Sequence, residues 1–294
     1  MNYFDLHCDT LLDCCDTQQP LMHNNLHISL DAARKYGQYT QLLGIFSRTS
    51  LSDDEAFEKF LKVTAYFRTL ELPENFRPIL AVEGANLTGG KIERVDRIYE
   101  EGVRFMTLVW GGYTCIGGAH NDGRGLTEFG RAVTERCLEI GIVPDLSHAS
   151  DATFWEAVEI ADRHQKPIVC THSNSRAVRN HTRNLTDEMF GALVKRGGLA
   201  GISMVRSHLT DKPECGIPEI AAHIEHYLSL GGENTVAMGC DLDGTRPLPD
   251  GITGVGDIEK IADYLARLNY SDELIDKIFW QNANNFVRRN GILK

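Results

Sequence analysis

The sequence predicts an α/β fold, a (β/α)8 TIM barrel, and three observations support this prediction. Short, mostly apolar runs alternate with amphipathic helical patterns along the whole chain, which is typical of a parallel sheet joined by helical crossovers. There are eight such runs, and eight strands close this type of barrel. The chain has 294 residues, and such a barrel needs roughly 250. We therefore expect residues 1–294 to form a single barrel domain.

An open, doubly wound parallel sheet is the main alternative, because it shows the same alternation of strands and helices. Nucleotide-binding sheets of that kind carry a G-x-G-x-x-G turn after the first strand or a G-x-x-x-x-G-K-[ST] loop. The sequence has no G-x-G-x-x-G after its first predicted strand and no G-x-x-x-x-G-K-[ST]. The barrel is therefore the predicted architecture.

The eight predicted strands are short, and several consist almost entirely of apolar residues, as strands covered on both faces do. In chain order they are Tyr3–His7, Gln41–Phe46, Arg77–Glu83, Arg104–Val109, Ile142–His148, Pro167–His172, Leu199–Met204 and Thr235–Asp241.

Helical patterns separate the strands, and several have recognisable ends. Ser52 and Glu55 form a capping box, which predicts a helix that runs to about Glu71. Residues 126–140 carry apolar side chains at helical spacing. Two further helices are predicted, one from the N-cap Thr186 to a stop at Gly197-Gly198 and one from the N-cap Ser271 to near Arg289.

The charge balance and the apolar pattern argue against two kinds of partner. The sequence has 30 Lys and Arg against 41 Asp and Glu, a formal net charge of −11. Nucleic-acid binding depends on clustered Lys and Arg, so we expect none. No apolar run approaches the roughly 20 residues that span a bilayer. The N-terminus MNYFDLHCDT shows no export signal. We therefore expect a cytoplasmic protein without a membrane partner.

The eight cysteines are interpreted as reduced thiols, several of them buried. Cys14 and Cys15 are neighbours, and the sequence contains no C-x-x-C pair. A long chain without an export signal is expected to keep its thiols reduced.

Ionisable residues gather at the ends of the predicted strands. Five of the eight strands finish on a residue that can bind a metal ion or move a proton, and Asp9 shares a strand face with His7. The six residues are His7, Asp9, Glu83, His148, His172 and Asp241. Barrel enzymes carry their active sites at the carboxyl ends of the strands, so we expect these side chains to lie together.

Three imidazoles and three carboxylates form a nitrogen and oxygen ligand set of the kind that zinc uses. Six groups are too many for one tetrahedral ion with an open position. They suit two ions that share a bridging carboxylate, with one acid left to carry a proton, because paired ions stabilise both oxygens of a hydrolytic displacement. A single histidine at a strand end is more often a packed or exposed residue, but five coincident strand ends favour a site. The residues therefore predict metal-dependent hydrolysis.

The other histidines are placed outside this set. Six of them lie in predicted loops or helices and are interpreted as solvated or structural: His23, His27, His164, His208, His223 and His226. His120 and His181 lie in loops that can reach the site, and their role stays open. Asp243 shares a face with Asp241 and either supports the site or belongs to a turn before Gly244.

A series of motifs along the chain has a recognisable order: FDLHCDTLLD, AVEGAN, RFMTL, GLTEFGRAV, PDLSHAS, THSNS, RNLTDE, GCDLDG and QNANNFVR. These motifs resemble those of the membrane dipeptidase family (renal dipeptidase-like, peptidase family M19) of the amidohydrolase superfamily, and they cover nearly the whole chain. The H-x-D of the first strand, in place of H-x-H, is more typical of this family than of the superfamily. The resemblance implies an amidohydrolase-like barrel.

The resemblance also implies the metal ligands. His7, Asp9 and Glu83 would hold one Zn²⁺ ion. Glu83, His148 and His172 would hold a second, so that Glu83 and a hydroxide bridge the two ions.

The resemblance further implies a dipeptidase. Asp241 would be the acid/base residue beside the hydroxide. Arg183 matches the arginine that receives the C-terminal carboxylate of a dipeptide, which a guanidinium fork binds through two hydrogen bonds. By this resemblance we expect the enzyme to accept small dipeptides, including some with a C-terminal D-residue, and to form a homodimer.

The sequence departs from the family at two positions that bear on specificity. Trp110, in TLVW, stands where eukaryotic members carry a substrate-contacting histidine, and Val205 stands where a contacting tyrosine is expected. The loop Gly111–Asp122 is expected to shape the pocket. Two alternatives remain, namely hydrolysis of N-acyl amino acids or cyclic amides by the same metals, and a non-catalytic zinc-binding barrel. Asp241 argues against the second, because a structural site needs no proton carrier.

Overall fold

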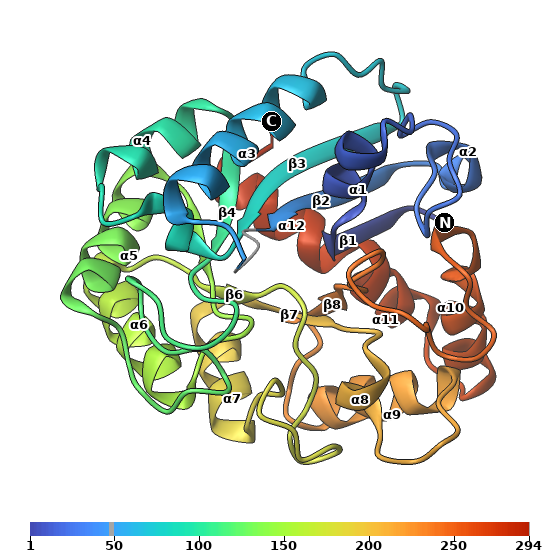
Figure 1. The fold of residues 1–294 in the computed structure, drawn as a ribbon. Coiled ribbons are helices and arrows are strands. Elements are labelled where there is room, and N and C mark those ends of the chain that lie inside the picture. The colour runs from blue at the N-terminus through green and yellow to red at the C-terminus, as the bar shows by residue number, and fades with distance from the viewer. Residues whose placement is uncertain (47–49, 294) are drawn as a thin grey trace.

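The computed structural model describes residues 1–46 and 50–293. Eight parallel strands, each paired with the next and β8 with β1, form a closed barrel surrounded by helices (Figure 1). The strands are β1 (Tyr3–Cys8), β2 (Tyr39–Phe46), β3 (Phe76–Glu83), β4 (Val103–Thr107), β5 (Val143–Asp145), β6 (Val169–Cys170), β7 (Leu199–Ile202) and β8 (Val236–Met238). The predicted (β/α)8 barrel is confirmed, and each of the eight predicted runs contributes one strand.

Several strands end earlier than predicted, and this changes how the site is built. β5, β6 and β8 end before His148, His172 and Asp241, and Asp9 follows the end of β1. The prediction that these residues end or extend strands is therefore wrong, because they lie in the turns that follow the strands. His148 and Asp241 have φ angles of 70° and 60°, in the left-handed region, which cannot continue a strand.

The helices lie between and around the strands (Figure 1). They are α1 (Thr10–Thr17), α2 (Leu30–Ala33), α3 (Asp53–Phe67), η1 (Ala85–Thr88), α4 (Glu93–Glu100), α5 (Glu128–Ile140), α6 (Asp151–His164), α7 (Asp187–Arg196), α8 (Arg206–Leu209), α9 (Ile217–Ser229), η2 (Val255–Asp257), α10 (Glu259–Arg267), α11 (Asp272–Asp276), the π-helical turn η3 (Lys277–Gln281) and α12 (Asn282–Arg289).

The caps predicted for three helices are present. Ser52 and Glu55 form the capping box of α3, Thr186 caps α7 and Ser271 caps α11. α3 ends at Phe67 instead of near Glu71, because the N–H groups of Thr69 and Leu70 bond to carbonyl oxygens three residues back and not four. The chain leaves this helix through hydrogen-bonded turns.

The interior of the barrel is filled by apolar side chains, so the barrel is a packed core and not a pore. Its buried residues come from all eight strands: Phe4, Leu6, Leu42, Ile79, Ala81, Phe105, Val143, Val169, Leu199 and Ala237. Trp280 of η3 and Phe286 of α12 belong to the same cluster and close the end of the barrel where the strands begin. The other end, formed by the carboxyl ends of the strands, is left for the polar residues.

The cysteine side chains agree with their interpretation as thiols, several of them buried. All eight cysteines, each within the described residues, are free thiols, and seven are buried. Across residues 1–46 and 50–293, no helix is long and apolar enough to cross a membrane.

The close approach of the backbone at Gly239 predicts that a larger residue there destabilises the barrel. A Cβ at Gly239, just after β8, would lie 1.7 Å from the carbonyl oxygen of Thr171. We expect Gly239→Ala to lower the free energy of unfolding by about 3 kcal/mol, because the backbone must move to relieve the overlap. Gly191→Ala is the matched control, since it lies exposed within α7. Alanine should raise stability there by about 0.5–1 kcal/mol. Urea unfolding of both variants tests this, and similar small effects would show that the barrel is looser than described.

Candidate metal centre

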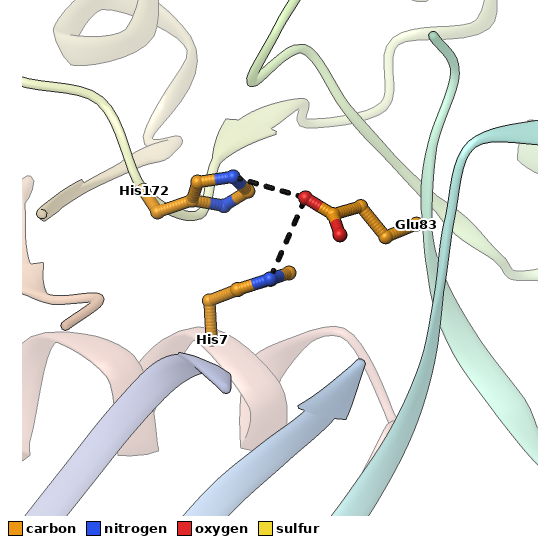
Figure 2. Close-up of side chains that lie close together, drawn as sticks. All are labelled: His7, Glu83 and His172. Atoms are coloured by element: carbon orange, nitrogen blue, oxygen red, sulfur yellow. Dashed lines mark ion pairs between the residues drawn. The ribbon is translucent and has the colours of Figure 1, made fainter. Parts of the chain in front are cut away.

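The predicted site residues meet around one oxygen atom, Oε1 of Glu83 at the end of β3. The Nε2 atoms of three histidines lie close to it, at 3.6 Å for His7, 3.0 Å for His148 and 3.3 Å for His172. Figure 2 shows the rings of His7 and His172 directed at the Glu83 carboxylate. These residues lie at the ends of β1 and β3 and in the turns that follow β5 and β6, so the cluster exists only because the barrel closes.

The two remaining carboxylates lie beside His7. One ligand atom from each of His7, Asp9 and Asp241 lies within 4.8 Å of the others, and the same holds for His7, Glu83 and His172. His7 therefore belongs to both groups. All six residues that the sequence predicted for the site are brought together.

The donor set fits divalent metal ions. Among the residues that the structure describes, the buried atoms His7 Nε2 and Asp9 Oδ1 have no hydrogen-bond partner. A buried polar atom without a partner costs free energy. The Nε2 atoms of His148 and His172 also face each other at 2.9 Å. Neutral imidazoles and carboxylates converging in this way satisfy zinc or a similar ion, so the residues present fit the metal that the pattern predicts.

The protonation states favour metal binding as well. Burial lowers the pKa of His7 and of His148, so both rings are neutral near pH 7 and keep a lone pair for a ligand bond. Burial and the neighbouring charges of Glu83 and Asp241 raise the pKa of Asp9. Burial also raises the pKa of Asp241 to about 7, although His7 opposes this shift. Positive ions placed among these carboxylates would favour their ionised forms.

A backbone contact fixes which nitrogen of His148 is available. Its Nδ1 lies 3.0 Å from the carbonyl oxygen of Trp110. A carbonyl only accepts, so Nδ1 carries the hydrogen and Nε2, the atom beside Glu83, keeps the lone pair.

A cavity of about 340 Å³ opens over these residues. It is lined by Asp9, Phe46, Glu83, Trp110, Gly111, His120, Asn121, His148, Arg183, Val205, His208, Asp241, Gly244 and Thr245. Trp110 packs against Phe46 and His148, with ring centroids 4.7 and 5.7 Å away. The predicted substrate-binding residues Arg183 and Trp110, and also Val205, therefore lie in the cavity wall.

Arg183 is the buried cation of this cavity, with 4% of its surface exposed. Its Nη2 donates to the carbonyl oxygen of His172 at 3.4 Å. Within residues 1–46 and 50–293, its buried Nη1 has no hydrogen-bond partner. A guanidinium held in this way is available to an anionic group in the cavity.

Several lining residues could not be assigned to the site from the sequence. The sequence pattern predicts a solvated or structural role for His208, and the structure places this residue in the cavity wall, with its ring 4.6 Å from that of His181. His120 also lines the cavity. Phe46 ends a predicted strand, a position that could have suggested a wall residue. His208 lies on a short helix after β7, and nothing in the local sequence indicates where it points.

Asp243, whose role the sequence does not decide, and His223 both make structural contacts. Asp243 accepts hydrogen bonds from Thr10 Oγ1 at 2.5 Å and from His27 N at 2.7 Å, so it anchors the loop that contains His27. His223 is buried, and its Nδ1 accepts a hydrogen bond from Ser175 N at 3.0 Å.

Comparisons with known proteins agree with this description. Residues 68–289 match the family model of the membrane dipeptidases, peptidase family M19. A Klebsiella pneumoniae protein described as "Uncharacterized protein in pqqA 5'region" is 29% identical over 216 residues, which cover 68% of this chain and 77% of that protein. Human Dipeptidase 3 is 26% identical over 222 residues, which cover 72% of this chain but only 44% of that protein.

Two solved structures share the fold over almost their whole length. A metallo peptidase from Rhodobacter sphaeroides superposes with a TM-score of 0.88, and a metallo peptidase of family M19, dipeptidase AC, with 0.89. Each is 22% identical, and the match covers 99% of both chains.

The closed barrel, with imidazoles and carboxylates at the carboxyl ends of its strands, defines an amidohydrolase-like barrel. Within that class, the chain belongs to the membrane dipeptidase family, peptidase family M19. Membership makes it a metal-dependent enzyme of the dipeptidase type.

Metal binding at this centre can be tested by thermal unfolding. We expect Zn²⁺ to raise the melting temperature of metal-depleted protein, since a free ion at 100 times its Kd adds about 2.7 kcal/mol of stability per site. His172→Ala should remove much of this increase. The control is His23→Ala, an exposed histidine paired with Asp31, which should keep the full increase. An equal increase in both variants would place the bound ion elsewhere.

Proposed function

We propose that this protein is a binuclear zinc dipeptidase that hydrolyses the peptide bond of small dipeptides. The observation that carries the proposal is the convergence of three Nε2 atoms on Glu83 Oε1, at 3.0 to 3.6 Å. In the proposed assignment, the first ion is held by His7, Asp9 and Glu83. The second is held by Glu83, His148 and His172.

Bound zinc would supply a water of lowered pKa and would withdraw electrons from the scissile carbonyl. Glu83 suits the shared position because the Nε2 atoms of His7, His148 and His172 all lie within 3.6 Å of its Oε1. Its two oxygens can each take one ion. The lowered pKa values of His7 and His148 keep these two rings neutral, so each has a lone pair for a ligand bond.

Asp241 is proposed as the residue that carries the proton. It lines the cavity and lies 3.9 Å from His7 Nε2 through its Oδ1. Hydrolysis requires a proton to leave the attacking water and to reach the departing amine. A buried carboxyl group whose pKa is raised toward neutrality can hold that proton and release it.

Arg183 is proposed to bind the C-terminal carboxylate of the substrate. Its buried guanidinium faces the same cavity as Asp241, so a bound dipeptide would have its carboxylate at one side and its peptide bond near the proton carrier. The cavity of about 340 Å³ lies at the small end of the range for ligand sites. That size favours a dipeptide over a longer peptide. Trp110 and Phe46 would exclude water from one side of the bound substrate.

Family membership supports this substrate class, and the Rhodobacter sphaeroides neighbour is described as liganded with a phosphinate mimic of the dipeptide L-Ala-D-Ala. We therefore include D-residues at the C-terminal position among the proposed substrates. The alternative function is hydrolysis of N-acyl amino acids or cyclic amides at the same metal site.

The proton role of Asp241 predicts a selective loss of turnover. We expect the zinc-loaded protein to hydrolyse members of a panel of L,L- and L,D-dipeptides. Asp241→Asn should lower kcat by about 10²- to 10⁴-fold, because the amide cannot take the proton. Metal analysis serves as the control, since this variant should keep its zinc. If all dipeptides stay intact while N-acyl or cyclic amides are cleaved, the substrate class is wrong and the metal site stands.

The carboxylate role of Arg183 predicts a loss that depends on the substrate. Arg183→Ala should lower kcat/KM by about 10- to 100-fold for free dipeptides, the range expected for hydrogen bonds to a charged group. Arg183→Lys should recover part of the loss, because it restores the charge but not the fork. Dipeptide amides, which lack the carboxylate, should be cleaved at similar low rates by all three proteins. A uniform loss on both substrate types would contradict the assignment.

A further inference from the structure

A further buried carboxylate, that of Asp145 at the end of β5, lies next to the candidate metal centre without belonging to it. It is 1% exposed. Its Oδ1 accepts hydrogen bonds from the backbone N–H groups of Ser147 and Thr171 at 3.0 and 2.9 Å. Its Oδ2 accepts from the hydroxyls of Thr107 and Thr171 at 2.5 and 2.7 Å. Asp145 therefore ties together the ends of β4, β5 and β6.

The ionised form of Asp145 is the one that fits these contacts, because two backbone N–H groups and two hydroxyls surround it. Burial raises the pKa of this carboxyl group. The neighbouring His172 side chain and the hydrogen bonds from Thr107, Thr171 and Ser147 lower the pKa by more than burial raises it, so the pKa of Asp145 lies below its usual range. An ionised carboxylate can only accept hydrogen bonds.

This fixes the direction of the next hydrogen bond. A threonine hydroxyl has one hydrogen, and the hydrogen of Thr171 is donated to Asp145 Oδ2. Thr171 Oγ1 also lies 2.8 Å from Nδ1 of His172. With its hydrogen used, the hydroxyl must accept here, so the hydrogen of this bond belongs to Nδ1 of His172.

The tautomer of His172 follows from this chain of bonds. With the hydrogen on Nδ1, the lone pair of the neutral ring lies on Nε2. That atom is 3.3 Å from Glu83 Oε1 (Figure 2) and 2.9 Å from Nε2 of His148. The lone pair thus lies at the centre of the cluster, where a metal ligand is needed.

We propose that Asp145, acting through the hydroxyl of Thr171, is a positioning residue that holds His172 in its Nδ1–H tautomer and directs the Nε2 lone pair to the metal centre. The inference rests on the proposed role of His172 as a ligand. It adds a three-residue relay, Asp145–Thr171–His172, that the ligand set alone does not contain.

A second buried aspartate provides a comparison within the same protein. Asp5 of β1 accepts hydrogen bonds from the backbone N–H groups of His7 and Cys240, both at 3.0 Å, and from the hydroxyl of Tyr3 at 2.5 Å. It supports the backbone beside His7 and Asp241, but none of these bonds reaches the ring of a histidine. Asp5 therefore represents a purely structural role, and Asp145 adds control of a tautomer.

Substitutions of Thr171 separate the relay from its structural surroundings. Thr171→Val keeps the shape of the side chain and removes the hydroxyl, whereas Thr171→Ser keeps the hydroxyl. We expect Thr171→Val to weaken the binding of one of two Zn²⁺ ions by about 10- to 100-fold, the usual cost of losing a group that orients a ligand. Thr171→Ser should keep the wild-type affinity. Competition with a chromophoric chelator measures both ions.

Asp145→Asn tests the direction of the relay. The asparagine NH₂ group can donate to Thr171, and the hydroxyl is then free to donate to Nδ1 of His172. The hydrogen of the ring would move to Nε2. ¹⁵N NMR of histidine-labelled, metal-free protein distinguishes the tautomers, and loss of a signal in His172→Asn assigns the ring. We expect Nδ1–H in the wild type and Nε2–H in Asp145→Asn. Asp5→Asn is the matched control and should leave the His172 signal unchanged.

The outcomes separate this inference from the proposed function. If the wild type binds no Zn²⁺ or His172→Asn binds two ions normally, the ligand assignment fails. If the wild type binds two ions and Thr171→Val binds them equally well, or His172 keeps Nδ1–H in Asp145→Asn, the relay is wrong and the metal site stands. If Thr171→Val and Thr171→Ser lower the melting temperature of the metal-free protein and the Zn²⁺ affinity alike, Thr171 acts only through packing, which also overturns the relay.

Discussion

The crowding of ionisable groups around Glu83 Oε1 is the constraint on which the rest of the structure depends. Three imidazoles and three carboxylates occupy a space of a few ångströms; four of these residues are buried, and His148 and Asp9 are partly buried. Burying charges of one sign together costs free energy unless a cation or a network of donors compensates it. The cluster therefore needs both a rigid framework and ligand atoms that point inward.

The barrel supplies that rigidity through its closure. Five of the strands bring the six site residues to the same rim, and no strand could shift alone without disturbing its two neighbours. The packed interior, with Trp280 and Phe286 at the opposite end, resists such shifts. Gly201 and Gly239 let the backbone of β7 and of the residue after β8 approach the carbonyl oxygen of Thr171, so the backbone beside His172 is packed closely against both. The apolar packing of this core stabilises the fold and offsets the cost of burying polar residues at one end of the barrel.

The contacts that support the proposed ligands are of two kinds, those to the histidine rings and those to the backbone. The carbonyl oxygen of Trp110 and the hydroxyl of Thr171 determine which ring nitrogen of His148 and of His172 carries the hydrogen. Asp5 instead accepts hydrogen bonds from the backbone N–H groups of His7 and Cys240. The cavity is lined by aromatic side chains such as Trp110 and by the buried Arg183. The proposed metal ligands and Arg183 thus all lie at the carboxyl ends of strands or in the segments that follow them.

The amino-acid sequence was enough to predict the eight strands, the caps of α3, α7 and α11, and the meeting of six ionisable residues at one rim. These depend on patterns within one segment, and the carboxyl ends of parallel strands in a barrel must meet at one rim. The ends of β5, β6 and β8, the place of His208 in the cavity and the bond from Thr171 to Asp145 were not predictable in this way. Turns with left-handed backbone at His148 and Asp241, and contacts between residues distant in sequence, arise only when the barrel closes and brings separate segments within hydrogen-bonding distance.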